Sequence, residues 1–194
     1  ITYGDWSSDV CSSDLIKTEE PSSDAVDFNE LYPLSLSEAE EKAGFTLITP
    51  SRLPETLLFD GASFDEETSI VTVFYHYNDP NHPGNTDGLM VREQLKPEGD
   101  DCELCSFIPG TYDQSNSSGV VGADAKIESI QAGQYTGQYV EGVWAASDPN
   151  VWHWETDDYS KKLRFESDYL AVEVITFSYR LEKEDLLAIV ESLQ

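Results

Sequence analysis

The residues best suited to chemistry are two cysteines, Cys102 and Cys105, in the segment Cys-Glu-Leu-Cys. The third cysteine of the chain, Cys11, lies in the first fifteen residues, which are set aside below. Paired thiols at this spacing are typical of a redox site, part of a metal site or a local disulfide. The surrounding residues do not show the βαβ pattern of a thioredoxin-like site, and two cysteines are too few for a four-thiolate zinc site. His76, His82 and His153 are not spaced as in a zinc finger. We therefore predict a disulfide or two free thiols, and no metal.

A second group of interest is aromatic. Trp152 and Trp154 alternate along one segment, so their side chains share one face of a strand, and Trp144 lies in the preceding strand. Such a row is either a platform for a sugar, a lipid chain or a peptide, or the core side of a sheet, where cross-strand aromatic pairs are stabilising. We treat Trp144, Trp152 and Trp154 as a candidate ligand or interaction surface. His153 is expected on the opposite face.

The oxygen-rich loop from Asp79 to Asp87 is a weaker candidate. Its carboxylates and amides suit calcium, but Pro83 and Met90 occupy the fifth and twelfth positions of an EF-hand pattern, and the twelfth requires a glutamate. Because proline, glycine and asparagine are ordinary turn formers, we favour a turn.

Catalytic signatures are missing from the sequence. It contains no Gly-x-Ser-x-Gly elbow, no His-Glu-x-x-His helix and no phosphate-binding loop. The adjacent carboxylates Asp100-Asp101 and Asp157-Asp158 lie in predicted turns, where the burial that tunes a general acid is not expected. We predict no catalytic residue, no cofactor and no enzyme activity.

The segment that positions these groups begins with a helix. Ser35 and Glu38 form a capping-box pattern, and Gly44 stands where a left-handed C-cap is expected, so a helix should end near Ala43. Phe45, Leu47 and Ile48 are apolar and predict a short strand over 45–48, followed by a turn between Pro50 and Pro54.

Strand patterns dominate the rest of the chain. They cover 57–64, 69–77, 88–95, 125–130, 134–144, 151–155, 161–166 and 169–177, and we expect the last three to continue one antiparallel meander. Leu186, Ile189, Val190 and Leu193 indicate a closing amphipathic helix. The fold class is therefore α+β: an antiparallel, meander-rich sheet packed with an N-terminal and a C-terminal helix and covered on one face.

The first residues have an unusual origin. Residues 5–15 read DWSSDVCSSDL, which resembles the translation of a common short-read sequencing adapter. We predict that residues 1–15 are an artefact outside the fold, that the acidic segment 16–33 is a linker, and that the native N-terminus is missing. A single domain should cover 34–194, with an insertion rich in glycine, serine, proline and aspartate at 96–124.

Charge limits the partners. The chain has 11 basic and 38 acidic residues and a formal net charge of −27. This negative field repels nucleic acids and anionic lipid surfaces, so neither is an expected partner. A solvated acidic surface for solubility or high salt is expected, with a basic partner or multivalent cations as the alternative.

A family resemblance rests on several motifs in order. Four features occur in this order: SLSEAEEKAGFTLITPSRLPETL, the hairpin strands, GQYTGQYVEG before a tryptophan-containing strand, and LEKEDLLAIVESL. In these features and their order the chain resembles the bacterial domain-of-unknown-function family four-three-six-seven. The resemblance covers residue 34 to the C-terminus and implies an extracytoplasmic C-terminal module of a membrane-anchored anti-sigma-like or lipoprotein-sorting-like envelope protein. It implies no catalytic residues, and membrane contact only through the missing N-terminal anchor. The insertion carrying Cys102 and Cys105, and the acidic surface, depart from the family pattern.

Three functions follow as hypotheses. The first is a non-enzymatic extracytoplasmic interaction or sensory module with an unknown protein partner. The second is a carrier or binding domain for an apolar, lipid-like ligand, suggested by the aromatic sheet. The third is a hydrolase, suggested only by the abundance of carboxylates.

Overall fold

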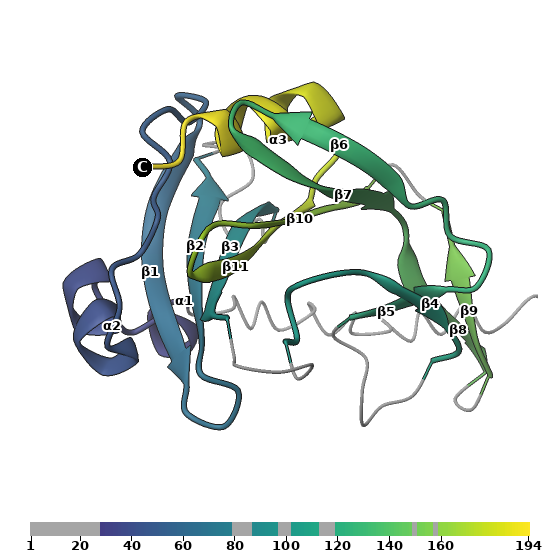
Figure 1. The fold of residues 1–194 in the computed structure, drawn as a ribbon, viewed down its shortest axis with the longest axis horizontal. Coiled ribbons are helices and arrows are strands. Elements are labelled where there is room, and N and C mark those ends of the chain that lie inside the picture. Colours follow the sequence, from purple (N-terminus) through teal and green to yellow (C-terminus); the bar gives the residue numbers. More distant parts are fainter. Residues whose placement is uncertain (1–27, 79–86, 97–101, 113–118, 149–150, 157–158) are drawn as a thin grey trace, which may run out of the picture.

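The chain folds around a seven-stranded antiparallel sheet (Figure 1). The computed structural model describes residues 28–78, 87–96, 102–112, 119–148, 151–156 and 159–194. The sheet order is β1-β2-β3-β11-β10-β7-β6, beside a parallel pair β4-β5 and a hairpin β8-β9. The elements are α1 (Phe28–Leu31), α2 (Leu36–Ala43), β1 (Leu57–Asp65), β2 (Ile70–Tyr77), β3 (Gly88–Leu95), β4 (Ile108–Gly110), β5 (Val120–Gly122), β6 (Glu128–Ala132), β7 (Tyr135–Glu141), β8 (Val143–Asp148), β9 (Val151–Glu155), β10 (Ser160–Glu166), β11 (Leu170–Phe177) and α3 (Lys183–Glu191). The predicted α+β class, with one of the longer helices near each end, is confirmed.

Helix α2 begins and ends where its caps predict. The Ser35 backbone N–H donates to the Glu38 carboxylate at 2.9 Å, and the Glu38 N–H donates to the Ser35 hydroxyl at 3.3 Å. Gly44 closes the helix with φ of 77°. Ala39 is fully buried, so the narrow apolar stripe of the helix packs on the sheet.

The strand predicted for residues 45–48 is wrong. Leu47 and Ile48 are buried as expected, but they form no ladder. Their backbone N–H groups donate instead to carboxylates, Leu47 to Glu40 at 3.0 Å and Ile48 to Glu93 at 2.9 Å. Side chains distant in sequence thus satisfy the donors that a strand would have used.

The segment before α2 docks on the first hairpin of the sheet. β1 and β2 form the predicted hairpin, with a bulge between Phe59 and Gly61. Tyr32, which falls in the predicted linker, stacks on Phe74 with ring centroids 5.0 Å apart. A side chain at Gly61 would overlap the Tyr32 backbone carbonyl, so a glycine here lets residue 32 dock.

The main core lies between the sheet and the helices. α2 and α3 cover one face, and the alternating residues of β2 confirm the predicted partition: Val71, Val73, Tyr75 and Tyr77 point into this core. The C-terminus is joined to the 49–52 segment, because Thr49 and Gln194 exchange backbone hydrogen bonds of 3.3 and 3.2 Å.

Three predictions about the sheet require correction. The strand predicted over 134–144 is interrupted at Gly142, and its two parts, β7 and β8, belong to different sheets. β9 does not continue the meander: it pairs with β8, while β10 pairs with β7 and β11. The sheet is also not covered on one face alone. Residues 102–107 lie across the centre of the other face, where Leu104, Ile70 and Ala171 form a small cluster with the two cysteines.

Candidate functional site

The three candidate tryptophans come together on the β8-β9 hairpin. Trp144 lies opposite Trp154, and Trp152 lies opposite Ala146, two positions along the same face. This confirms the prediction that the tryptophans share a face. His153 lies opposite Ala145 and is exposed. The hairpin projects from the sheet at the end opposite to β1 (Figure 1).

A glycine directs the chain from β7 into this hairpin. Gly142 has φ of 121°, a conformation that L side chains rarely adopt, and its N–H donates to the Ser160 carbonyl at 2.9 Å. A Cβ at this position would lie 2.6 Å from the Trp154 indole nitrogen. Gly142 therefore both turns the chain and makes room for the tryptophan ring.

The tryptophans differ in burial. Trp154 is 8% exposed and belongs to a satellite core with Phe107, Val121 and Val140. Gly122 packs so closely on Trp154 that any side chain there would overlap it. Trp144 and Trp152 are only half-buried. Trp154 thus has the structural role weighed from the sequence, whereas the other two rings remain accessible.

Tyr112 completes the aromatic group, and sequence reasoning missed it. Its ring stacks on Trp152 with centroids 4.1 Å apart and meets Trp144 edge-on at 5.5 Å. The Trp144 indole N–H donates to the Val120 carbonyl at 2.9 Å, which anchors the hairpin to β5. Tyr112 lies in the 96–124 insertion, where no periodicity indicates its partner.

These rings border an open pocket of about 250 Å³. Its lining comprises Gly110, Thr111, Tyr112, Gly122, Ala123, Asp124, Trp144, Trp152, His153 and Trp154. The hairpin supplies one wall, and β4, β5 and the residues after them supply the other. We call these residues the aromatic pocket.

Comparisons with protein-family models, curated proteins and solved structures gave no match.

The second candidate, Cys102 with Cys105, is a disulfide with Cα atoms 5.4 Å apart. Of the sequence alternatives, disulfide or free thiols, the bonded form is present. It closes a short loop in which Leu104 is fully buried against the sheet. We call residues 102–107 the clip.

A buried ionic row holds the clip on the sheet. Glu173 accepts from Arg164 and from Arg92, each at 2.8 Å, and Arg164 also donates to the carbonyls of Glu103 and Ser106 at 2.8 Å. The β3-β11-β10 register places Arg92, Glu173 and Arg164 side by side. The Arg164 guanidinium stands 4.6 Å from the Phe107 ring centre. This row positions the clip, and through it β4 and Tyr112.

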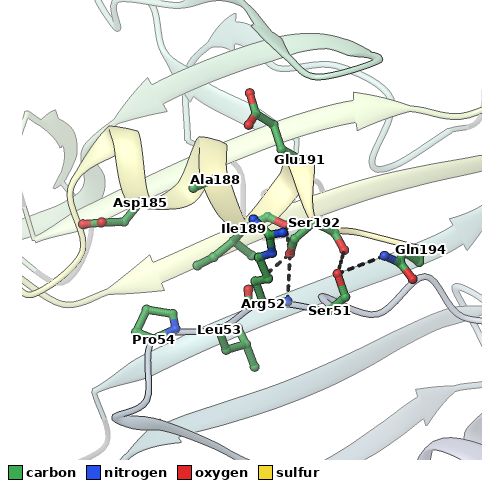
Figure 2. A pocket seen from close by; sticks show the side chains of 10 residues that line it. All are labelled: Ser51, Arg52, Leu53, Pro54, Asp185, Ala188, Ile189, Glu191, Ser192 and Gln194. Carbon is green, nitrogen blue, oxygen red and sulfur yellow. Dashed lines mark hydrogen bonds between the residues drawn. The ribbon is translucent and has the colours of Figure 1, made fainter.

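A larger cleft lies beside α3 (Figure 2). It holds about 510 Å³ between the turn at 51–54 and the helix. The Ser51 hydroxyl donates to the Ser192 carbonyl at 2.7 Å and accepts from the Gln194 amide at 3.1 Å. These groups join the C-terminal residues to the 51–54 turn. A further open hollow of about 660 Å³ lies around Ile48, Tyr135 and Tyr169.

Buried titratable groups lie elsewhere. Burial raises the pKa of Glu93 to about 8, and Glu93 lies in the main core beneath the 45–49 segment. Burial lowers the pKa of Lys162, whose ammonium stands 5.6 Å from the Trp154 ring centre. Neither group lines the aromatic pocket.

The remaining candidates do not converge. His76 of β2 lies 3.5 Å from the Asp60 carboxylate of β1. Both strands belong to the large sheet and not to the β8-β9 hairpin. Within the described ranges, no three histidine, cysteine or carboxylate side chains gather as metal ligands. The adapter-like residues, positions 79–86 of the calcium-like loop, and the pairs at 100–101 and 157–158 lie outside the described residues. The described helices include none with the length and apolarity of a membrane span.

Proposed function

We propose that this chain is a non-enzymatic interaction module of an extracytoplasmic compartment, and that it binds through the aromatic pocket. The observation that carries the proposal is the half-burial of Tyr112, Trp144 and Trp152 around an open hollow. Large aromatic side chains that stay accessible at a concave surface are typical of binding sites.

The way these rings are held supports binding. Tyr112 reaches the pocket from the clip side, and the two tryptophans reach it from the hairpin. Trp144 is fixed by a hydrogen bond to Val120, and Trp152 by its stack on Tyr112. Rings held in this way lose little freedom on binding, which favours affinity.

The contacts of the buried charged pair Arg164 and Glu173 support a non-enzymatic role. Arg164 and Glu173 are buried where the clip packs on the sheet, and Arg164 donates to two backbone carbonyls of the clip and to Glu173. Their geometry accounts for the position of the clip, so no reaction is needed to explain their burial. The second hypothesis, an apolar-ligand binder, would use this same pocket.

The compartment is supported by the disulfide and by the family resemblance. Disulfides persist where glutathione and thioredoxin do not reduce them, as in the bacterial periplasm and at cell surfaces. The resemblance implies a module held at the membrane by an N-terminal anchor. Reading the parent gene upstream of Ile16 tests this part: an export signal or anchor supports it, and an ordinary cytosolic start contradicts it.

The binding part is tested with the purified chain of residues 1–194 and a variant, Trp152→Ala. Thermal unfolding is measured with a panel of sugars, short-chain alcohols and alkylammonium salts. A compound that binds the native state raises the midpoint by mass action. We expect one class to stabilise the wild type and not the variant. Leu58→Ala removes an exposed apolar side chain of β1 and serves as control. If no compound distinguishes the wild type from Trp152→Ala, the proposal is wrong.

A further inference from the structure

The rings around the aromatic pocket meet in two ways: Trp152 stacks on Tyr112 with planes 21° apart, whereas Trp144 meets Tyr112 and Trp154 edge to face. The Trp144 and Trp154 planes are 83° apart, and the Tyr112 and Trp144 planes are 61° apart, each pair with centroids separated by 5.5 Å. Rings that meet in this way form a corner with the face of one ring beside the edge of the next. The electron-rich face of an indole attracts cations, more strongly than the ring of tyrosine or phenylalanine.

The aromatic pocket is lined by a carboxylate. Asp124 lines the pocket, and its carboxylate lies beside Gly122, which packs directly on Trp154. The whole chain carries a formal net charge of −27, which concentrates cations near the surface and repels anions. The positive group that already approaches Trp154, Lys162, is not part of the pocket lining.

The size of the hollow restricts the ligand. About 250 Å³ is below the usual range for a drug-sized molecule, so the pocket takes one compact group while the rest of the ligand stays in solvent. A strongly hydrated ammonium gains little from aromatic walls, since it must give up water. An alkylated ammonium is weakly hydrated, fills a rounded space and keeps its charge.

We infer that the aromatic pocket binds a quaternary ammonium group. This inference rests on the proposed function, because it names the ligand class of the same site. Trp144, Trp152 and Tyr112 supply ring surfaces, and Asp124 supplies the opposite charge. The group could arrive on a free solute or on a phosphocholine lipid headgroup, which share this chemistry.

The test uses the chain of residues 1–194 with choline and its neutral isostere, 3,3-dimethylbutan-1-ol. Both are titrated at constant ionic strength, with binding followed by tryptophan fluorescence and by the unfolding midpoint. We expect saturable choline binding, at least about tenfold tighter than that of the isostere. Phosphatidylcholine vesicles form a separate arm: co-sedimentation identifies a lipid headgroup as the source, and binding confined to free choline identifies a solute.

Variants assign the binding to the pocket. Trp152→Ala should weaken choline binding about tenfold or more, whereas Trp152→Phe, which keeps an aromatic ring, should retain most of it. Asp124→Asn should weaken choline severalfold and leave the isostere unchanged. Glu66→Gln removes an equal charge in the exposed β1-β2 turn and should change neither. Far-UV circular dichroism checks that each variant is folded.

The outcomes separate the two claims. If the isostere binds as tightly as choline and Trp152→Ala abolishes both, the pocket is a binding site but the ammonium inference is overturned. If choline binding is unaffected by both Trp152→Ala and Asp124→Asn, the ligand binds elsewhere and the inference is overturned. If neither choline, isostere nor vesicles bind, the ammonium inference fails, and the proposed function then depends on the wider panel of compounds.

Discussion

The ionic row under the clip gives a sharp prediction for Arg164→Met. The side chains of Arg164 and Glu173 are 0% and 1% exposed, so the substitution leaves a buried carboxylate with Arg92 as its remaining partner. It also leaves the carbonyls of Glu103 and Ser106 without these donors. Removing one partner of a buried ion pair costs about 3–5 kcal/mol, and an unmatched carbonyl adds to this.

The expected loss is therefore at least about 3 kcal/mol in the free energy of unfolding. For a chain of this size it corresponds to a fall of about 6–12 °C in the unfolding midpoint. Urea denaturation followed by circular dichroism and tryptophan fluorescence measures the free energy. The change should appear in the midpoint concentration, with little change in the slope.

Two further variants define the cause. The double variant Arg164→Met/Glu173→Met also removes the carboxylate that Arg164→Met leaves without its main partner. It should therefore recover a large part of the lost free energy of unfolding, although it changes two residues. Lys96→Met breaks the surface pair with Glu166, whose side chains are 34% and 42% exposed, and should cost at most about 1 kcal/mol. A loss below about 1 kcal/mol for Arg164→Met, or a double variant as unstable as the summed single variants, would refute the buried-row explanation.

Three other predictions follow from the same contacts. Replacing Cys102 and Cys105 by serine opens a four-residue loop and should lower the free energy of unfolding by about 2 kcal/mol. Urea denaturation with and without reductant measures the loss, and an unchanged stability in oxidising buffer would contradict the prediction. Burial raises the pKa of Glu93 from 4.5 to about 8, so unfolding releases a proton at any pH between these values. The unfolding free energy should therefore fall by up to about 1.4 kcal/mol for each unit that the pH rises across this window. Glu93→Gln should flatten this slope and be the more stable form at pH 8, which a series of melts at different pH measures. Ser35→Ala should cost about 1 kcal/mol through the lost cap of α2, and Ser37→Ala, within the helix, is its control in the same melts.

Local signals predicted the secondary structure well. The Ser35 and Glu38 pattern and Gly44 located α2, since a cap depends on neighbouring residues. Alternation placed Trp152 and Trp154 on one face, because side chains of a strand alternate whatever the fold. These features need no information from distant parts of the chain.

Distant partners determined what the sequence did not predict. Residues 45–48 look like a strand, yet Glu93 takes the Ile48 donor from 45 residues away. Arg164 fixes the clip from 61 residues beyond Glu103. Tyr112 joins the tryptophans only because the clip and β4 carry it there. Charged residues in strands read as solvent-facing, so a buried row of them has no local signature.

The separation between the main core and the satellite cluster around Trp154 has an evolutionary consequence. The main core is built by α2, α3 and the large sheet, whereas the aromatic pocket belongs to a satellite cluster around Trp154. The satellite arises from two excursions of the chain, one between β3 and β6 and one between β7 and β10. Substitutions at the pocket-lining positions of these excursions, outside the clip, alter the pocket without changing any side chain of the main core. Related chains can therefore diversify in ligand preference while retaining the same scaffold.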